Sequence, residues 1–96
     1  MKPSTALRGK RDEVLAIAAR YGAYNVRVFG SVARGEDTDR SDLDLLVDRD
    51  DDRPLSDLGL FAADVRDALE CRVDAVTSDG LHRLLSKRIL DEATPF

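Results

Sequence analysis

The chain has 96 residues, of which 43% are hydrophobic and 35% are charged, so it has room for one small domain with a single core. Its net charge of −4 argues against nucleic acid as the direct partner, because proteins that grip nucleic acid usually carry a basic excess. No apolar run is long enough to span a membrane, no apolar segment marks a signal peptide, and the single Cys71 cannot form an internal disulfide. We therefore expect a cytoplasmic protein.

The first half of the chain carries the pattern of one helix and two strands. Apolar residues recur at helical spacing at Val14, Ile17, Ala18 and Tyr21, and Gly22 is placed to end that helix. Two short apolar runs then predict strands, with a helical turn and a polar loop between them. The predicted elements are, in chain order, a helix, a strand, a short helical turn and a strand at about residues 5–21, 25–29, 31–34 and 43–47.

The second half predicts a helix, a strand and a helix, at about residues 54–70, 72–77 and 81–91. The acidic connection at residues 48–53 is expected to be a solvated loop, and the only histidine, His82, a surface residue rather than a catalyst. This order of elements predicts an α+β (mixed α/β) fold, in which a small three-stranded mixed sheet is flanked by helices.

The most informative motif is Gly30-Ser31 followed, after ten residues, by Asp42-Leu43-Asp44. The Gly-Ser pair comes directly after one predicted strand, and the two aspartates open the next. Taken singly, a Gly-Ser pair is most often only a turn, and an Asp-x-Asp at a strand edge is often a solvated rim. Their spacing and their placement on the predicted elements favour a nucleotidyl-transfer site.

The acidic half of this motif predicts a magnesium site. Alternate residues of a strand point the same way, so Asp42 and Asp44 share a face at a separation of roughly 7 Å. Magnesium prefers hard oxygen ligands and is commonly held by one or two carboxylates together with substrate phosphates. Asp74, inside the next predicted strand, is the candidate for a third metal ligand and for the base that accepts the proton of an attacking hydroxyl.

The Gly-Ser half predicts the phosphate end of the site. Glycine at position 30 lets the backbone approach a ligand closely, and Ser31 opens a helical turn whose free N–H groups favour an anion. Arg34 shares a face with Ser31 and can hold a phosphate oxygen, while Ser41 offers a further hydroxyl. These four residues are the predicted nucleotide-binding set.

Residues 30–36 and 41–47, GSVARGE and SDLDLLV, resemble the DNA polymerase β-like nucleotidyltransferase superfamily. Within it the chain is similar to the minimal nucleotidyltransferases, the MntA-type antitoxins that are paired with HEPN-domain ribonuclease toxins. The resemblance covers nearly the whole chain, including the C-terminal residues 89–95, and implies one nucleotidyltransferase domain over residues 1–96. Larger relatives carry a second domain with the base and acceptor sites, so we expect a partner protein to complete the pocket here.

The resemblance implies a specific reaction. Similar proteins transfer AMP from ATP to a tyrosine hydroxyl of the partner toxin and so silence it. Carried over to this sequence, Asp42 and Asp44 would hold magnesium, and Asp74 would be the third acid and base. The positions that match the nucleotide-phosphate site are Gly30, Ser31 and Arg34.

Two other functions remain open on the sequence alone. The chain could neutralise its partner by complex formation, with a nucleotide site that is not needed for protection. It could also nucleotidylate a small molecule such as an aminoglycoside by the same chemistry, although so short a chain offers few residues for a drug pocket.

Overall fold

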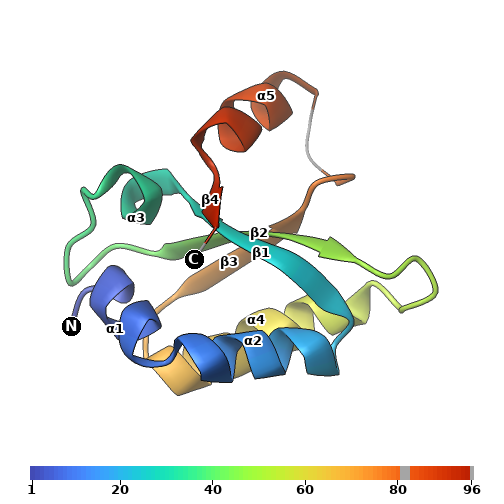
Figure 1. Cartoon of the computed structure of the whole chain (residues 1–96), viewed down its shortest axis with the longest axis horizontal. Helices are drawn as coiled ribbons and strands as arrows, with labels where there is room; N and C mark the ends of the chain where they lie inside the picture. Colours follow the sequence, from blue (N-terminus) through green and yellow to red (C-terminus); the bar gives the residue numbers. More distant parts are fainter. Residues whose placement is uncertain (81–82, 96) are drawn as a thin grey trace.

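The computed structural model describes residues 1–80 and 83–95, so Leu81 and His82 lie outside the described residues. Helices α1, α2 and α4 lie on one side of a sheet, and α5 stands on the other (Figure 1). In chain order the elements are α1 (Pro3–Gly9), α2 (Arg11–Arg20), β1 (Ala23–Phe29), α3 (Gly30–Arg34), β2 (Leu43–Arg49), α4 (Ser56–Leu69), β3 (Val73–Thr77), α5 (Arg83–Glu92) and β4 (Thr94–Pro95). None of the described helices is long and apolar enough to cross a membrane.

The α+β class is confirmed, but the sheet has four strands, and the prediction of three was wrong. The strand order is β3-β2-β1-β4, with β2 and β3 parallel and the other two pairs antiparallel. The additional strand, β4, pairs Thr94 with Val28 and Pro95 with Arg27. Two residues, one of them a proline, carry no strand periodicity, so only the tertiary pairing reveals them as a strand.

The core lies between the sheet and the three helices on its covered face. On β2, Leu43, Leu45 and Val47 are fully buried and alternate with residues that face the opposite side of the sheet. Helix α4 packs Phe61 and Val65 against the same core. The parallel pairing of β2 and β3 requires a crossover connection, and α4 provides it.

The N-terminal helix is broken into α1 and α2, whereas the sequence pattern predicted one continuous helix. Lys10 stands between them with φ −126° and ψ 29°, outside the helical region, and it follows Gly9, a poor helix former. The Lys10 ammonium donates a hydrogen bond of 2.8 Å to the carbonyl of Ala68 at the end of α4. The break lets α1 turn back so that Ala6 and Leu7 join the core.

Strand β1 contains a bulge at Asn25. The pairing with β2 shifts register between Tyr24 and Arg27, because β1 has one more residue than β2 in that interval, and Asn25 has φ +50°. Asparagine tolerates this left-handed conformation better than most residues. The extra residue places both Ala23 and Val26 in the core although they are three positions apart.

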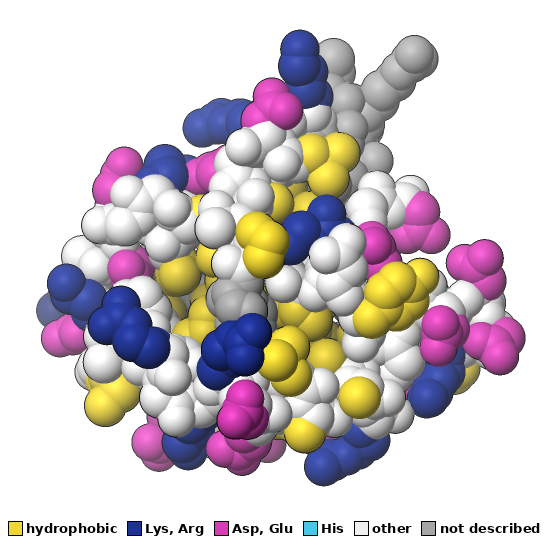
Figure 2. All heavy atoms as spheres, viewed as in Figure 1, with side chains coloured by type: hydrophobic (Ala, Val, Ile, Leu, Met, Phe, Trp, Pro, Cys, Tyr) yellow, Lys and Arg dark blue, Asp and Glu magenta, His cyan; other side chains and the backbone are white. Residues whose placement is uncertain are grey.

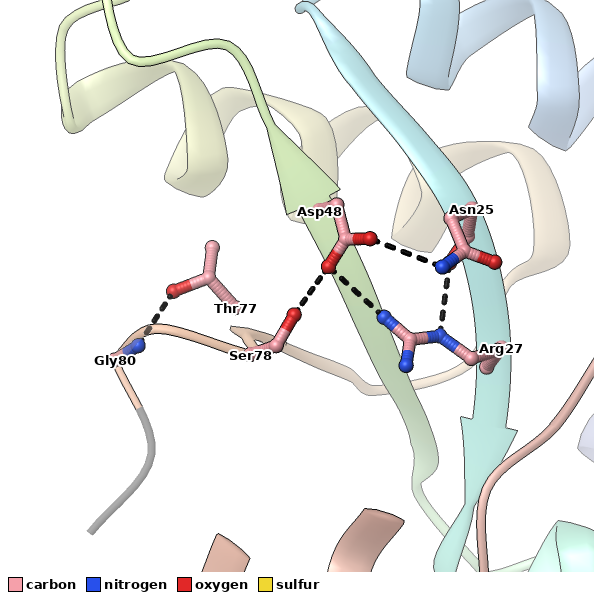
Figure 3. A network of polar contacts seen from close by, with 6 residues as sticks. All are labelled: Asn25, Arg27, Asp48, Thr77, Ser78 and Gly80. Atoms are coloured by element: carbon pink, nitrogen blue, oxygen red, sulfur yellow. Dashed lines mark hydrogen bonds and ion pairs between the residues drawn. The ribbon is translucent and has the colours of Figure 1, made fainter. Parts of the chain in front are cut away.

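Asp48 belongs to β2 rather than to a solvated loop, which corrects the prediction for this residue. Its carboxylate accepts hydrogen bonds from Ser78 Oγ, from Asn25 Nδ2 at 2.9 Å and from Arg27 Nη2 at 3.0 Å (Figure 3). These hydrogen bonds lower the pKa of Asp48, and the one from Ser78 has the largest effect. This network joins the end of β3 to β2 and to the bulge of β1, and so fixes one end of the sheet.

Candidate functional site

Three aspartates lie on the face of the sheet that α1, α2 and α4 leave uncovered. In the parallel pairing of β2 with β3, Asp44 is directly opposite Asp74. Their neighbours Leu43 and Val73 pack into the core, so both aspartates face the other side, on strands about 4.8 Å apart. Asp42 precedes β2 by one position and shares the face of Asp44. The register of β2 and β3 therefore brings all three carboxylates to the same side of the sheet.

The pKa of Asp44 reflects its burial and the two aspartates near it. Burial, together with the negative charges of Asp74 and Asp42, raises the pKa of Asp44 to about 6, while the nearby charge of Arg34 opposes the shift. Burial is the larger cause of the shift, and crowding by the like charges adds to it. Such crowding is typical of sites that bind cations or transfer protons.

Asp42 has a buried oxygen with an unusual environment. Its Oδ1 atom is shielded from solvent and has no hydrogen-bond partner, although Arg72 Nε lies 2.9 Å away. The Arg72 guanidinium thus pairs with this oxygen by charge, while its N–H does not point at the oxygen in hydrogen-bond geometry. A metal ion bound at this shielded oxygen would therefore take the place of the Arg72 guanidinium.

The donor set fits a divalent cation held by two carboxylates and completed by a ligand. Among the described residues, no three His, Cys, Asp or Glu side chains lie together at metal-ligand spacing. Magnesium is usually bound by one or two carboxylates plus substrate phosphates, and Asp42 and Asp44 supply hard oxygen atoms of that kind. A role for Asp74 as a third ligand stays a prediction.

Gly30 lies so close to Asp44 that a side chain at position 30 would clash with the Asp44 carboxylate. It has φ +71°, and a Cβ atom built on it would lie 2.2 Å from Asp44 Oδ2. Glycine is therefore required twice, by the left-handed backbone and by the close approach of the carboxylate. The turn from β1 into α3 and the first carboxylate of β2 thus form one compact unit.

Arg34, at the end of α3, has two carboxylate partners. Its Nη1 atom lies 2.5 Å from Glu92 Oε1 of α5, and its Nε atom lies 3.3 Å from Glu36 Oε2. These hydrogen bonds raise the pKa of Arg34, and the one to Glu92 has the largest effect. A phosphate bound by this guanidinium would therefore exchange places with a carboxylate.

The two serines of the predicted set lie in different settings. Ser31 is the second residue of α3, directly after Gly30, and is half-buried. The Ser41 hydroxyl accepts a hydrogen bond of 2.8 Å from the backbone N–H of Thr38 and so organises the loop before β2. The structure thus gives Ser41 a role in its own turn, and its predicted contact with phosphate stays a prediction.

Two residues at the site escaped the sequence analysis, Arg72 and Glu92. Arg72 pairs with Asp42 because β2 and β3 run in register, and Glu92 reaches Arg34 from the far end of the chain. No local pattern marks either residue. Only the strand register or the position of α5 could have identified them.

Comparison with known proteins gives a consistent picture. A family model described as nucleotidyltransferase domain matches residues 11–96. A Methanocaldococcus jannaschii protein provisionally named protein adenylyltransferase MJ0435 is 35% identical over 83 residues, which are 86% of this chain and 89% of that protein. A second protein of that organism, provisionally named protein adenylyltransferase MJ0126, is 35% identical over 75 residues, 76% of this chain and 74% of the relative.

Solved structures agree with these sequence matches. A structure provisionally described as a minimal nucleotidyltransferase has a TM-score of 0.85 and 45% identity, and the match covers 97% of this chain and 95% of that one. A toxin–antitoxin crystal structure with AMP-PNP has a TM-score of 0.76 at 19% identity, over 88% of this chain and 69% of the other. A mutant of the toxin–antitoxin MntA-HpeT has a TM-score of 0.72 at 15% identity, and the match covers 86% of this chain and 68% of the other. The last two likenesses show a shared fold.

Proposed function

This chain belongs to the nucleotidyltransferase domain family, and we propose that it is a protein adenylyltransferase that moves AMP from ATP to a tyrosine of a toxin partner. The observation that carries the proposal is the register of β2 and β3, because it sets Asp74 beside Asp44 on the face of the sheet opposite α1, α2 and α4. The provisional names of the relatives and the toxin–antitoxin assemblies of similar fold support the same function. The partner expected from the resemblance is a HEPN-domain ribonuclease.

The carboxylates divide the chemical work between them. Asp42 and Asp44 would hold a magnesium ion, which when bound neutralises phosphate charge and stabilises the leaving oxygen. Asp74 is exposed and so is open to an acceptor hydroxyl that arrives from outside the chain. As that hydroxyl attacks the α-phosphorus of ATP, Asp74 accepts its proton. The new bond joins the acceptor oxygen to the α-phosphorus, the bond to the β-phosphate oxygen breaks, and diphosphate leaves.

The Gly30 turn and Arg34 position the nucleotide for this reaction. The absence of a side chain at Gly30 lets a phosphate approach the backbone beside Asp44, and Ser31 adds a hydroxyl at the same turn. Arg34 presents a forked guanidinium that matches phosphate oxygens once it leaves its carboxylate partners. Catalysis in such a site depends mainly on positioning and on charge.

Mass spectrometry of the partner tests the proposal. The purified chain, ATP and magnesium are mixed with the protein encoded beside it, and the partner is weighed before and after. The expected result is a gain of one or more AMP units on a tyrosine. The same reaction without magnesium should leave the mass unchanged. A partner that is bound tightly but gains no mass would favour neutralisation by complex formation alone.

A further inference from the structure

A groove of about 590 Å³ lies between α3, which carries Arg34, and α5. Three cations, Arg34, Lys87 and Arg88, line it together with two carboxylates, Asp91 and Glu92. Lys and Arg side chains are visible over α5 at the top of the molecule (Figure 2). The groove therefore brings two basic side chains of α5 to the same space as Arg34.

Arg34 links the groove to the aspartate site. Arg34 lines the groove, and its charge also acts on Asp44, as does the charge of Glu92. α3 and α5 are in direct contact. A ligand that begins at Asp44 and passes Arg34 therefore enters the space beside α5.

The contacts of the groove show which kind of ligand it fits. The carboxylate of Glu92 is 18% exposed and binds Arg34 as an anion of the ligand would. Lys87 and Arg88 are exposed and, within the described part of the chain, form no ion pair. Two cations without an ion pair among the described residues, beside a guanidinium that already holds an anion, suit a ligand with several negative charges in a row.

We propose that α5 supplies half of the polyphosphate site: Lys87 and Arg88 hold the outer phosphates of the nucleotide, which displace Glu92 from Arg34. This inference rests on the proposed function and names further residues of the same site. The α-phosphate stays beside the aspartates, and the part of the ligand that α5 contacts is the diphosphate that leaves. Lys87 and Arg88 are thus positioning residues for the leaving group.

Isothermal titration of the full chain with ATP and with AMP, both with magnesium, tests the proposal. The Arg88→Ala variant should bind ATP about tenfold more weakly than wild type, because one charge-assisted contact to phosphate is lost. It should bind AMP as wild type does, since AMP lacks the outer phosphates. Lys87→Ala should behave in the same way. Arg66→Ala is the matched control, because Arg66 is an exposed arginine of α4 on the opposite side of the sheet.

A second variant tests the exchange with Glu92. Glu92→Gln removes the competing charge from Arg34, so inorganic tripolyphosphate should bind several-fold more tightly than to wild type. The inference is overturned if Arg88→Ala and Arg66→Ala bind ATP equally well, or if Arg88→Ala loses affinity for AMP as much as for ATP. It is also overturned if Glu92→Gln leaves the affinity for tripolyphosphate unchanged. In each of those outcomes wild type still binds ATP, so the proposed function stands. Wild type that binds no ATP would overturn both.

Discussion

At the scale of single residues, the approach of Gly30 to Asp44 gives the sharpest prediction. Gly30→Ala would strain a backbone with φ +71° and push the Asp44 carboxylate away from a Cβ that would lie 2.2 Å from it. Left-handed backbone in a non-glycine residue costs about 1–2 kcal/mol. The displaced carboxylate should lower the rate of AMP transfer about a hundredfold, measured by initial rates.

Gly35 offers a matched control for this variant. It has φ +72°, but a Cβ atom at this position would meet nothing within 4 Å, so Gly35→Ala carries the same backbone strain without a clash. Both variants should lose similar stability in thermal unfolding. Equal rates of AMP transfer in the two variants would show that the contact with Asp44 has no part in catalysis.

The raised pKa of Asp44 predicts a pH-dependent stability. With a pKa of about 6 in the folded chain against an ordinary 3.8, the fold favours the protonated carboxyl, and this stabilisation is lost as pH rises through about 6. Asp44→Asn stays neutral and should therefore be more stable than wild type at about pH 8 by about 2 kcal/mol. Near pH 4 the two should be nearly equal. Urea unfolding with a chelator present measures this difference.

Asp50→Asn serves as the control for the pH series, since Asp50 is exposed beyond the end of β2. Its stability should follow that of wild type at every pH. If Asp44→Asn were the less stable protein at about pH 8, the crowding of the three carboxylates would not be destabilising.

At the scale of the elements, the loop residue Asp37 caps the N-terminal end of α1. The buried carboxylate of Asp37 accepts a hydrogen bond of 2.9 Å from the backbone N–H of Ser4 in the first turn of α1. This is the contact that an N-cap residue would make, supplied here by a distant part of the chain. Asp37→Ala should cost about 1 kcal/mol and lower the melting temperature by about 4–8 °C. Asp51→Ala, in an exposed turn, should leave the melting temperature unchanged.

The Asp48 network makes a prediction for the far end of the sheet. Asp48→Ala would leave the guanidinium of Arg27, whose side chain is only 14% exposed, without its carboxylate, and would also free Asn25 and Ser78. A loss of about 2–3 kcal/mol in the free energy of unfolding is expected. Asp48→Asn keeps the size of the side chain and should lose less. A melting temperature unchanged by Asp48→Ala would mean that the network contributes nothing.

At the scale of the whole molecule, we expect the proposed catalysis and the proposed partner binding to be separable by mutation. The Asp42→Asn, Asp44→Asn double variant removes the charges that would hold magnesium while the core face of β2 stays intact. It should still form the complex with the partner but transfer no AMP. Co-purification and mass spectrometry of the partner measure the two properties side by side. A double variant that protects cells from the toxin as fully as wild type would show that binding is sufficient.

Helix faces, strands and the alternation of residues along a strand were predictable, because each depends only on neighbouring residues in the sequence. The amphipathic faces of α2 and α4, the two strands that flank the Gly30 turn, and the alternation of Asp42 and Asp44 with the core residue Leu43 all follow from short-range periodicity. The break at Lys10 was missed because Gly9 disfavours a helix only weakly, and the contact with Ala68 that accompanies it is distant in sequence.

The sequence by itself determined the residue types of the site, their spacing within one turn and one strand, and the α+β class. The tertiary structure decided what depends on pairing between distant segments: the fourth strand, the register that sets Asp74 opposite Asp44, and the ion pair of Arg34 with Glu92. The physical reason is that strand register and helix docking depend on burial summed over the whole core, to which a single segment contributes only a part.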